Sequence, residues 1–459
     1  MRQTKFVLAA LAAAVLTACG GGSSQDAGDQ TLKTKFTNQV TFGDSLADVG
    51  TYAVGPVKAA GGGKFTINGT GSDPALSGKI WTEYTAAQFG LPADCPAQQG
   101  LNGTGAFAVP VVNNASCFNY AQGGARVTNP VGPHNRLTGD PIGALTVPVV
   151  TQIQNHLAKV GGKFSGTEVV MVMAGGNDEL MLLGQLSAAA TAAGTAAGTA
   201  AGNQAFATGL VTQFAAKTPN PATGAQAIGQ AVQTAAAAGK TQTEIVTAAI
   251  GAAIGAGADP SLATPAVYGP IVAKVTADAQ AAGAAAGAKA GADYAAAHGP
   301  ENVPLMAQAG TELANLVKTQ IIGKGANYVV VNNLPDVSIS PSAKAKDAGT
   351  QALIKAMAQA FNAALKAGLS GETKVLYVDL FTLSDDQSVN PGPYGLTNVT
   401  TPACGHNAFG DSSMGCNQTN LISGDVSHYL FADDVHPTPY EHSLIARYVA
   451  EQMVVKGWL

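Results

Sequence analysis

The 459-residue sequence is poor in charged residues, which make up 12% of the chain against about a quarter in an average soluble domain. Hydrophobic residues reach 46%, so the chain lacks the low hydropathy and high charge of a disordered protein. Its 24 lysines and arginines are outnumbered by 29 acidic residues, which leaves a formal charge of −5. Without an excess of cations, the sequence predicts no nucleic-acid partner and no attraction to anionic membrane surfaces.

Cysteine is scarce as well, with five residues in the chain, and none of them stands in a CxxC or Cys/His spacing typical of zinc. The 56 glycines follow no three-residue period, which excludes a collagen triple helix. The apolar run at residues 6–16 is shorter than the roughly 20 residues that a membrane-spanning helix needs. We therefore expect no metal site, no fibrous repeat and no segment that spans a membrane.

The N-terminus nevertheless looks like a targeting segment. Two basic residues precede the apolar run, which ends in Leu-Thr-Ala-Cys19 and is followed by Gly-Gly-Gly-Ser-Ser. This arrangement resembles a bacterial lipoprotein signal, and an ordinary secretory signal with a chance cysteine is the alternative. The resemblance implies a signal peptide over residues 1–18, a lipid on Cys19 and a tether over residues 19–35. Gly20 rather than aspartate after the cysteine implies an outer-membrane lipoprotein, facing the periplasm or the cell surface.

The other four cysteines are an even number in an oxidising compartment, so the sequence predicts two disulfides. Three pairings are open. We favour Cys95 with Cys117 and Cys404 with Cys416, because each pair brackets a loop rich in glycine and asparagine.

Short β-branched runs alternate with helical patterns along most of the chain, which predicts an α/β fold with a parallel sheet and helices on both faces. The most regular helical pattern covers residues 304–322, with Pro304 in its first turn and Gly323 at its end. The expected strands are residues 40–42, 169–173, 328–331 and 375–378.

The first strand leads into Gly43-Asp44-Ser45-Leu46, which places a serine on the turn after the strand. In an open parallel sheet ligands bind at the carboxyl ends of the strands, so a nucleophile would be useful at Ser45. A plain turn or a helix N-cap is the alternative interpretation.

Near the C-terminus, Asp433-Asp434-Val435-His436-Pro437 precedes an amphipathic helical pattern. An aspartate and a histidine three residues apart meet on one turn, and the carboxylate then fixes the imidazole tautomer that takes a serine proton. Asp434 is an alternative to Asp433, and His428 with Asp425 is the competing pair.

Two glycine-rich turns offer hydrogen-bond donors for a developing oxyanion. The first, Gly123-Gly124, follows a strand-like stretch, and the second, Gly175-Gly176-Asn177-Asp178, follows residues 169–173. Either one taken alone is most simply a tight turn.

Together and in this order, the four segments resemble the conserved blocks of the GDSL, or SGNH, hydrolase family. Residues 77–81 and 331–335 also stand where that family has similar stretches. The resemblance implies a three-layer α/β/α sandwich with a parallel sheet over residues 36–459. It covers roughly residues 36–180 and 301–455, and leaves residues 182–299 as an insertion.

The resemblance also implies the roles of individual residues. Ser45 is expected to be the nucleophile, His436 the general base and acid, and Asp433 the acid that orients it. The oxyanion hole would consist of the N–H groups of Ser45 and Gly124 and the side chain of Asn177.

The expected activity is hydrolysis of carboxylic esters, including lipids, without a metal or an organic cofactor. A lipid acyltransferase that uses the same acyl-enzyme is one alternative. A surface interaction protein with a vestigial catalytic frame is another. The sequence leaves the oligomeric state open.

The insertion at residues 182–299 is dominated by alanine, glycine, threonine and glutamine. It is either a partly disordered segment or a pair of helices packed through ridges of glycine. The glycines that would form the ridges are four residues apart, at Gly194, Gly198 and Gly202 and at Gly283, Gly287 and Gly291.

The insertion is expected to begin and end at the edge of the sheet that carries Ser45. Residues 169–173 deliver Asn177 to this edge, and the helix from Pro304 must descend from it to enter the next parallel strand. A lid or a substrate platform would use this position, whereas an inert appendage is the alternative.

Overall fold

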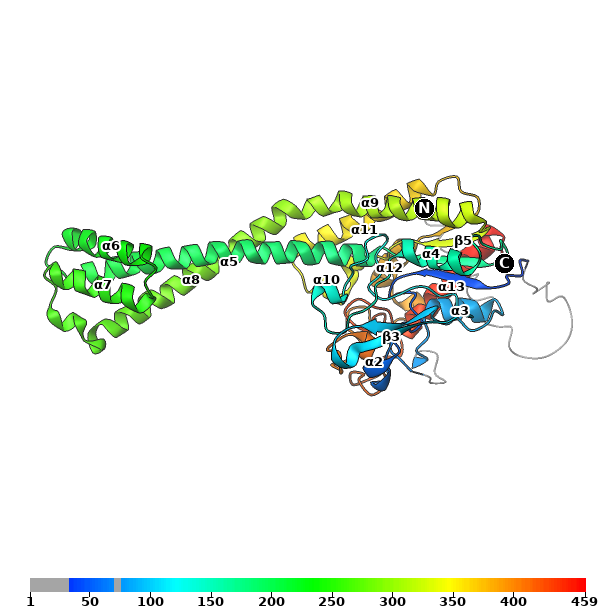
Figure 1. Cartoon of the computed structure of the whole chain (residues 1–459), viewed down its shortest axis with the longest axis horizontal. Coiled ribbons are helices and arrows are strands. Elements are labelled where there is room, and N and C mark those ends of the chain that lie inside the picture. Colours follow the sequence, from blue (N-terminus) through cyan, green and yellow to red (C-terminus); the bar gives the residue numbers. More distant parts are fainter. Residues whose placement is uncertain (1–32, 70–75) are drawn as a thin grey trace.

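The computed structural model describes residues 33–69 and 76–459. The predicted signal peptide, Cys19 and most of the predicted tether lie outside the described residues. The described chain forms an α/β part, from which a long helical arm extends (Figure 1).

Four parallel strands form the central sheet in the order β1-β4-β5-β6, which confirms the α/β prediction and its four strands. Asn119 extends the edge of this sheet next to β1, because the N–H of Thr41 donates to Phe118 O at 3.0 Å and the N–H of Tyr120 donates to Thr41 O at 2.8 Å. The strands are β1 (Gln39–Gly43), β4 (Val169–Met173), β5 (Tyr328–Asn332) and β6 (Val375–Val378).

Helices cover both faces of the sheet. Val170 and Val172 of β4 face a core formed with α4 (Val149–Lys159), α9 (Asn302–Leu316) and α11 (Ala348–Gly368). Met171 and Met173 face a second core, formed with α3 (Trp81–Gln88), α12 (Leu380–Val389) and α13 (Pro439–Lys456). Because alternate residues enter opposite cores, the strand is a continuous apolar run, as is typical of buried parallel sheets.

The end of the predicted helix over residues 304–322 differs from the expectation. It begins at Asn302 as α9, continues as a π-helical turn (Val317–Ile321) and closes with a 3-10 turn (Ile322–Lys324). Gly325 follows with a φ of 110°, a conformation that favours glycine. Gly325, rather than Gly323, is therefore the terminating residue.

Shorter elements lie around the sheet. The helices and strands are α2 (Gly55–Ala59), α10 (Pro341–Lys344) and the antiparallel pair β2 (Gln98–Asn102) and β3 (Ala108–Asn113). The 3-10 turns in the loops are η2 (Gly105–Phe107), η3 (Arg136–Thr138), η5 (Gly299–Glu301), η8 (Val337–Ile339), η9 (Gly392–Tyr394) and η10 (Ser413–Gly415).

The four cysteines of the described chain form two disulfides in the sequence-local arrangement. Cys95 pairs with Cys117, and Cys404 pairs with Cys416. The second disulfide closes the loop that carries η10.

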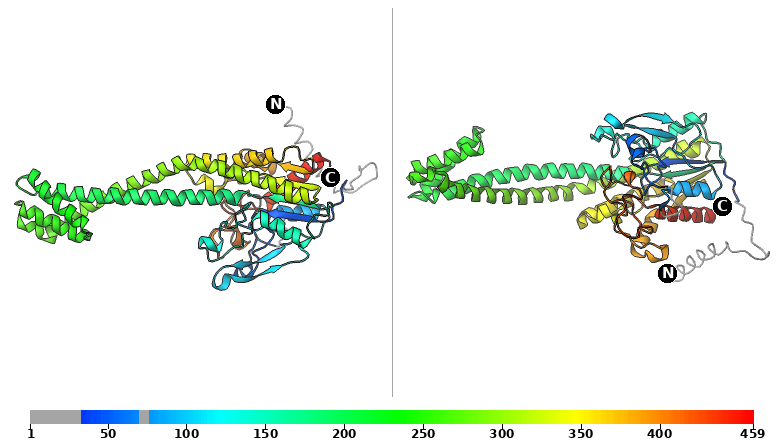
Figure 2. Two further views of the ribbon diagram at one scale, coloured as in Figure 1. Left: turned by 45° about the horizontal axis from the view of Figure 1, so that its top comes forward. Right: turned by 90° about the horizontal axis from the view of Figure 1, so that it is seen from below.

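The arm is an antiparallel pair of helices, α5 (Gly176–Ala215) and α8 (Pro265–His298) (Figures 1 and 2). At 1.5 Å per residue, the 40 residues of α5 span roughly 60 Å. At the far end, α6 (Pro221–Ala237), α7 (Gln242–Gly255) and η4 (Pro260–Ala263) form a small bundle, which we call the tip. Phe206, Leu210, Phe214, Ile228, Val246 and Ile250 are among the residues that make the hydrophobic core of the tip.

The glycine ridges hold the two long helices close together. A Cβ atom on Gly198 would lie 2.8 Å from Gly283 O, and one on Gly287 would lie 2.9 Å from Gly194 O. A side chain at these positions would therefore push the helix backbones apart. This contact confirms the glycine-ridge interpretation, and the low-complexity segment is ordered helix rather than partly disordered.

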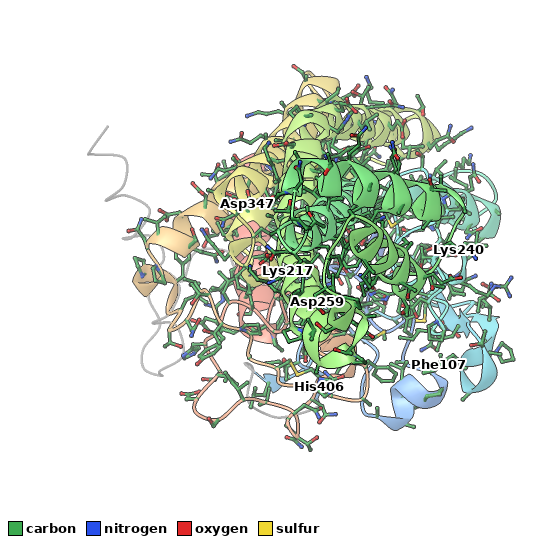
Figure 3. All side chains as sticks on the ribbon, turned by 90° about the vertical axis from the view of Figure 1, so that its left-hand side faces the viewer. Phe107, Lys217, Lys240, Asp259, Asp347 and His406 are labelled. Atoms are coloured by element: carbon green, nitrogen blue, oxygen red, sulfur yellow. A yellow bond between two sulfur atoms is a disulfide. The ribbon has the colours of Figure 1, made fainter. Side chains whose placement is uncertain are left out.

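Contrary to the expectation that no later segment resembles a membrane span, α5 is long and apolar enough to cross a membrane, judged by length and composition alone. Its partner α8, however, carries two exposed ion pairs, Lys274 with Asp278 and Lys289 with Asp293. The tip is charged as well, and Figure 3, seen from the tip end of the arm, shows its exposed Lys217, Lys240 and Asp259. Burying these charges in lipid would be costly, so composition alone does not make the arm a membrane anchor.

Candidate active site

Ser45 lies on a tight turn immediately after β1. The strand approaches β4 so closely at Gly43 that a Cβ atom there would overlap Met173 O. Asp44 then closes the turn, because its Oδ1 accepts the N–H of Leu46 at 3.1 Å. Ser45 is 8% exposed, so its hydroxyl lies in a sheltered position at the carboxyl edge of the sheet.

The structure brings Ser45, His436 and Asp433 together, although Ser45 and His436 are 391 residues apart in the sequence. Ser45 Oγ lies 2.9 Å from His436 Nε2, and His436 Nδ1 lies 2.8 Å from Asp433 Oδ2. The loop that carries the acid and the histidine leads into α13, where Thr438 caps the helix and Pro439 occupies its first position.

Asp433 is buried and has a full set of donors. Its Oδ1 accepts the N–H groups of Val435 at 3.0 Å and His436 at 2.7 Å, and its Oδ2 accepts the N–H of Ser413 at 2.7 Å. Burial alone would raise the pKa of this carboxyl, but His436 and these donors outweigh burial and hold the pKa well below its usual range. Asp433 is therefore ionised at neutral pH.

The pKa of the His436 imidazole is shifted in the opposite direction to that of Asp433. Burial lowers the pKa of its imidazole, but the adjacent Asp433 carboxylate outweighs burial and the net pKa is raised above the ordinary value. The ring of Phe65 packs at 5.0 Å from the imidazole, centroid to centroid. A Cβ atom on Gly123 would overlap that phenyl ring, so glycine at this position leaves room for Phe65.

The alternatives to this pair lie elsewhere. Asp434 is exposed, and no hydrogen bond joins its side chain to His436 in the described part of the chain. His428 is exposed, and its ring lies 4.3 Å from the ring of Tyr440. Asp425 instead accepts the hydroxyl and the N–H of Ser427. Neither Asp434 nor the His428–Asp425 pair takes part in the hydrogen-bonded series.

The Gly123-Gly124 turn presents a backbone donor. Gly124 has a φ of 80°, and a Cβ atom there would lie 2.6 Å from Pro133 O. Within residues 33–69 and 76–459, the N–H groups of Gly124 and Ser45 have no hydrogen-bond acceptor. The two groups are therefore free to donate to a ligand.

Asp48, which sequence analysis does not single out, holds this turn in place. Its buried carboxyl accepts the N–H of Gly123 at 2.8 Å and the N–H groups of Gly50 and Thr51. An acidic residue close after the serine is the only sequence signal for this role, and such a residue is common in turns.

Asn177 stands in the first turn of α5. It follows Gly175, whose φ of 122° and close contact with the Phe361 ring favour glycine. Asn177 Nδ2 donates one hydrogen to Ala125 O at 2.9 Å, which leaves the second hydrogen of the amide available.

A partly buried ion pair joins this turn to the Gly123-Gly124 loop. Arg126 Nε lies 2.9 Å from Asp178 Oδ1, and Asp178 Oδ2 accepts the N–H of Val127 at 3.0 Å. Asp178 belongs to the sequence block described above, but nothing in the sequence identifies Arg126 as its partner.

A pocket that is open to solvent at its mouth begins at Ser45, Asn177 and His436. Side chains from η8, α12 and α13 and from neighbouring loops form most of its wall. The apolar residues of the wall are Leu46, Leu180, Leu334, Pro335, Val337, Ile339, Leu380, Leu383, Leu430, Phe431, Val435, Pro437 and Ile445.

The arm begins beside this pocket but does not cover it. Gly176, Asn177 and Leu180, all in the first turns of α5, are the residues of the arm that line the pocket. The rest of the arm extends away from the α/β part in every view (Figures 1 and 2). The arm therefore starts at the predicted edge of the sheet but does not lie over the pocket as a closed lid would, and its use as a substrate platform stays a prediction.

The described residues offer no cluster of side chains suited to binding a metal ion. Among the residues that the structure describes, no group of three or more histidine, cysteine, aspartate or glutamate side chains is arranged to hold a metal ion. The groups available for chemistry are the serine, the imidazole, the carboxylate and the free N–H donors.

Comparison with known proteins gives matches over parts of the chain. The family model of the GDSL-like lipase/acylhydrolases matches residues 285–449, which include Asp433 and His436 but not Ser45. Two GDSL esterase/lipases of Arabidopsis thaliana are 30% identical over 94 residues and 32% identical over 81 residues. A third from the same plant is 29% identical over 140 residues.

These matches cover 20%, 18% and 28% of this chain and 25%, 22% and 38% of the three relatives. The chain thus spans about a quarter to just over a third of the length of the curated relatives that it matches. Over these parts, the chain is similar to the GDSL-like lipase/acylhydrolases.

Proposed function

We propose that this chain is a serine carboxylesterase or lipase that hydrolyses carboxylic esters through an acyl-enzyme. The observation that carries the proposal is the hydrogen-bonded series from Ser45 through His436 to Asp433. The names of the relatives, esterase/lipases, support the same class of reaction. The largely apolar pocket next to Ser45 supports a substrate with an apolar acyl group.

In the first step, Ser45 Oγ attacks the ester carbonyl carbon while His436 Nε2 takes the hydroxyl proton. The Asp433 carboxylate stabilises the imidazolium that forms. The negative charge on the former carbonyl oxygen is met by the N–H groups of Ser45 and Gly124 and by the amide of Asn177.

The tetrahedral intermediate then collapses. The bond to the alcohol oxygen breaks, the leaving oxygen takes the proton from His436, and the acyl group remains on Ser45. Water enters, gives a proton to His436 and attacks the acyl carbon. The second collapse releases the acid and returns the proton to Ser45 Oγ.

The proposal extends to the organisation of the chain. Residues 36–459 would form one SGNH hydrolase domain with the three-layer α/β/α arrangement, interrupted by the insertion at residues 182–299. The helices on both faces of the sheet and the position of the arm at its carboxyl edge support this division.

We also propose that residues 1–18 are a lipoprotein signal peptide and that a lipid on Cys19 anchors the protein in the outer membrane. The sequence Leu-Thr-Ala-Cys followed by a glycine- and serine-rich stretch supports this proposal. Cys19→Ser should abolish partitioning into detergent and leave ester hydrolysis intact. Unchanged partitioning would mean that another segment holds the membrane.

The catalytic proposal is tested with 4-nitrophenyl esters and with a fluorophosphonate probe that labels reactive serines. The wild-type protein should hydrolyse the esters and gain one probe adduct, which peptide mass spectrometry places on Ser45. Ser45→Ala should lose both properties while its thermal unfolding is unchanged. Wild-type turnover in this variant would overturn the proposal.

A further inference from the structure

The pocket next to Ser45 contains a pair of polar side chains that hydrolysis of a simple ester does not use. Gln387 of α12 and Glu441 of α13 both line the wall and are 1% and 4% exposed. Gln387 Nε2 lies 3.1 Å from Glu441 Oε1 and 2.9 Å from Glu441 Oε2. The two side chains form a polar patch, which we call the Gln387–Glu441 pair.

Asp336 and Ser384, which line the same part of the wall, are fully engaged. Asp336 accepts the hydroxyl of Ser338 and pairs with Lys355 at 2.8 Å. Ser384 Oγ donates to Phe381 O at 3.0 Å and accepts the N–H of Asp336 at 2.8 Å. These groups present no free donor or acceptor of the same kind to a substrate.

The Gln387–Glu441 pair is not fully engaged. Gln387 Oε1 has no donor among the residues that the structure describes, and the second hydrogen on Gln387 Nε2 has no acceptor beyond Glu441. Burial raises the pKa of Glu441 to about 8, so at neutral pH its carboxyl is mostly protonated and adds an O–H donor. The pair therefore offers both a donor and an acceptor without a net charge.

A plain alkyl chain in this pocket would cover these polar atoms without bonding to them, and buried polar groups without partners are costly. A hydroxyl group on the acyl chain would bond to both the donor and the acceptor of the pair, because it accepts one hydrogen bond and donates another. A charged group on the acyl chain would bind poorly here, since the neutral pair offers no opposite charge to it.

We propose that the Gln387–Glu441 pair recognises a hydroxyl group on the acyl chain, so that the substrates are esters of hydroxylated fatty acids. This inference rests on the proposed ester hydrolysis at Ser45. The pocket is assigned to the acyl chain because the acyl group stays bound to Ser45 between the two steps, whereas the alcohol has to leave.

The test uses 4-nitrophenyl esters of one fatty acid and of the same acid hydroxylated at successive carbons. At one or two positions, the hydroxyl should raise kcat/KM by roughly tenfold or more over the plain ester, as expected when a site is built to bond a hydroxyl. Calorimetric binding of the free acids to the Ser45→Ala variant should rank them in the same order, which gives a readout independent of turnover.

Variants of the pair sharpen the test. Q387M/E441M replaces both partners with apolar side chains of similar length, which avoids leaving one of them buried and unpaired. This variant should lose the preference, whereas Glu441→Gln, which keeps a donor and an acceptor, should retain it. Leu383→Ala is the matched control from the apolar wall and should lower kcat/KM for plain and hydroxylated esters alike.

The outcomes separate the two proposals. If the wild-type protein hydrolyses plain and hydroxylated esters equally at every position, the hydroxyl inference is overturned while ester hydrolysis stands. A preference that survives in Q387M/E441M, or one that follows a hydroxyl on the alcohol, also overturns it. If no ester is cleaved and the fluorophosphonate probe does not label Ser45, the proposed function itself has failed.

Discussion

The N–H of Ser413 donates to Asp433 Oδ2 at 2.7 Å, so a residue inside the Cys404–Cys416 loop supports the acid of the hydrogen-bonded series Ser45–His436–Asp433. The other side of the loop is attached as well, because the N–H of Cys404 donates to Ala432 O at 2.8 Å. The Cys404–Cys416 loop therefore contacts Asp433 through Ser413 and the preceding residue, Ala432, through Cys404.

This arrangement predicts that C404S/C416S reduces kcat by roughly tenfold, because Asp433 loses a fixed donor and His436 loses its orientation. C95S/C117S is a matched control. Each disulfide stabilises the protein by about 3 kcal/mol according to its loop length, so both variants should unfold at lower denaturant concentrations. Equal kcat values for the two variants, measured well below their unfolding midpoints, would contradict this role of the Cys404–Cys416 loop.

Asn177→Ala should lower kcat by roughly 10² to 10³, the usual effect of removing one oxyanion donor, with a small change in KM. The variant also loses the hydrogen bond to Ala125 O. Asn177→Asp is the comparison, because it keeps the size of the side chain but places a carboxyl beside the oxyanion. Steady-state kinetics should show both variants impaired, and a normal kcat in either would exclude Asn177 from the oxyanion hole.

The raised pKa of His436 predicts how activity depends on pH. A general base has to be neutral, so kcat/KM should rise with pH and reach half its maximum above pH 6.5, the ordinary value for histidine. Asp433→Asn removes the carboxylate that raises this pKa, so the midpoint should shift to lower pH while kcat falls about 10⁴-fold.

Asp44 titrates in the same region, because burial raises the pKa of its carboxyl to about 7. Comparing the profile with that of Asp44→Asn separates the two groups. If the midpoint disappears in Asp44→Asn, it belongs to Asp44 rather than to His436.

The arm should be dispensable for the choice of acyl chain, because it lines the pocket through Gly176, Asn177 and Leu180 alone. Replacing residues 188–297 with a short Gly/Ser linker keeps these residues. We expect the preference between short and long acyl esters to change by less than about threefold. Leu180→Ala is the positive control, since it alters the pocket wall. A shift of roughly tenfold or more in the arm-shortened protein would restore the lid interpretation.

The glycine ridges predict opposite effects for two similar substitutions. Gly198→Ala places a methyl group 2.8 Å from Gly283 O, so α5 and α8 have to separate. A Cβ atom on Gly184, in the same helix, meets nothing within 4 Å, and Gly184→Ala should stabilise the helix by about 1 kcal/mol. Hydrogen exchange along the arm should speed up in the first variant and slow down in the second. Slower exchange in both would mean that the ridge contact is loose.

Much of the fold could be predicted from the sequence, because the signals are local. Each of the four sheet strands is a short β-branched run, and such a run is buried on both faces wherever it lies in a parallel sheet. Glycines four residues apart share one face of a helix, so the spacing also predicts the glycine ridges of α5 and α8. The two disulfides follow from cysteines that are close in the sequence.

The candidate site could be predicted in part. Ser45, Asp433 and His436 stand in short motifs, and three residues are enough to bring an aspartate and a histidine onto one turn. The choice of Asp433 over Asp434 rested on the family spacing, and the structure shows the reason. The Asp433 carboxyl accepts backbone N–H groups from its own turn and from Ser413, whereas the Asp434 side chain is exposed.

Tertiary structure alone decided the features that join distant segments. Asp48 holds the Gly123-Gly124 turn, Ser413 supports Asp433, and Gln387 meets Glu441 across two helices. The direction of the arm is another such feature, because the orientation of α5 depends on how its first turn packs against the sheet. A local pattern records which face of a segment is apolar or which residue caps a helix. It does not record which residue from another part of the chain will become its partner, since that depends on how the whole chain folds.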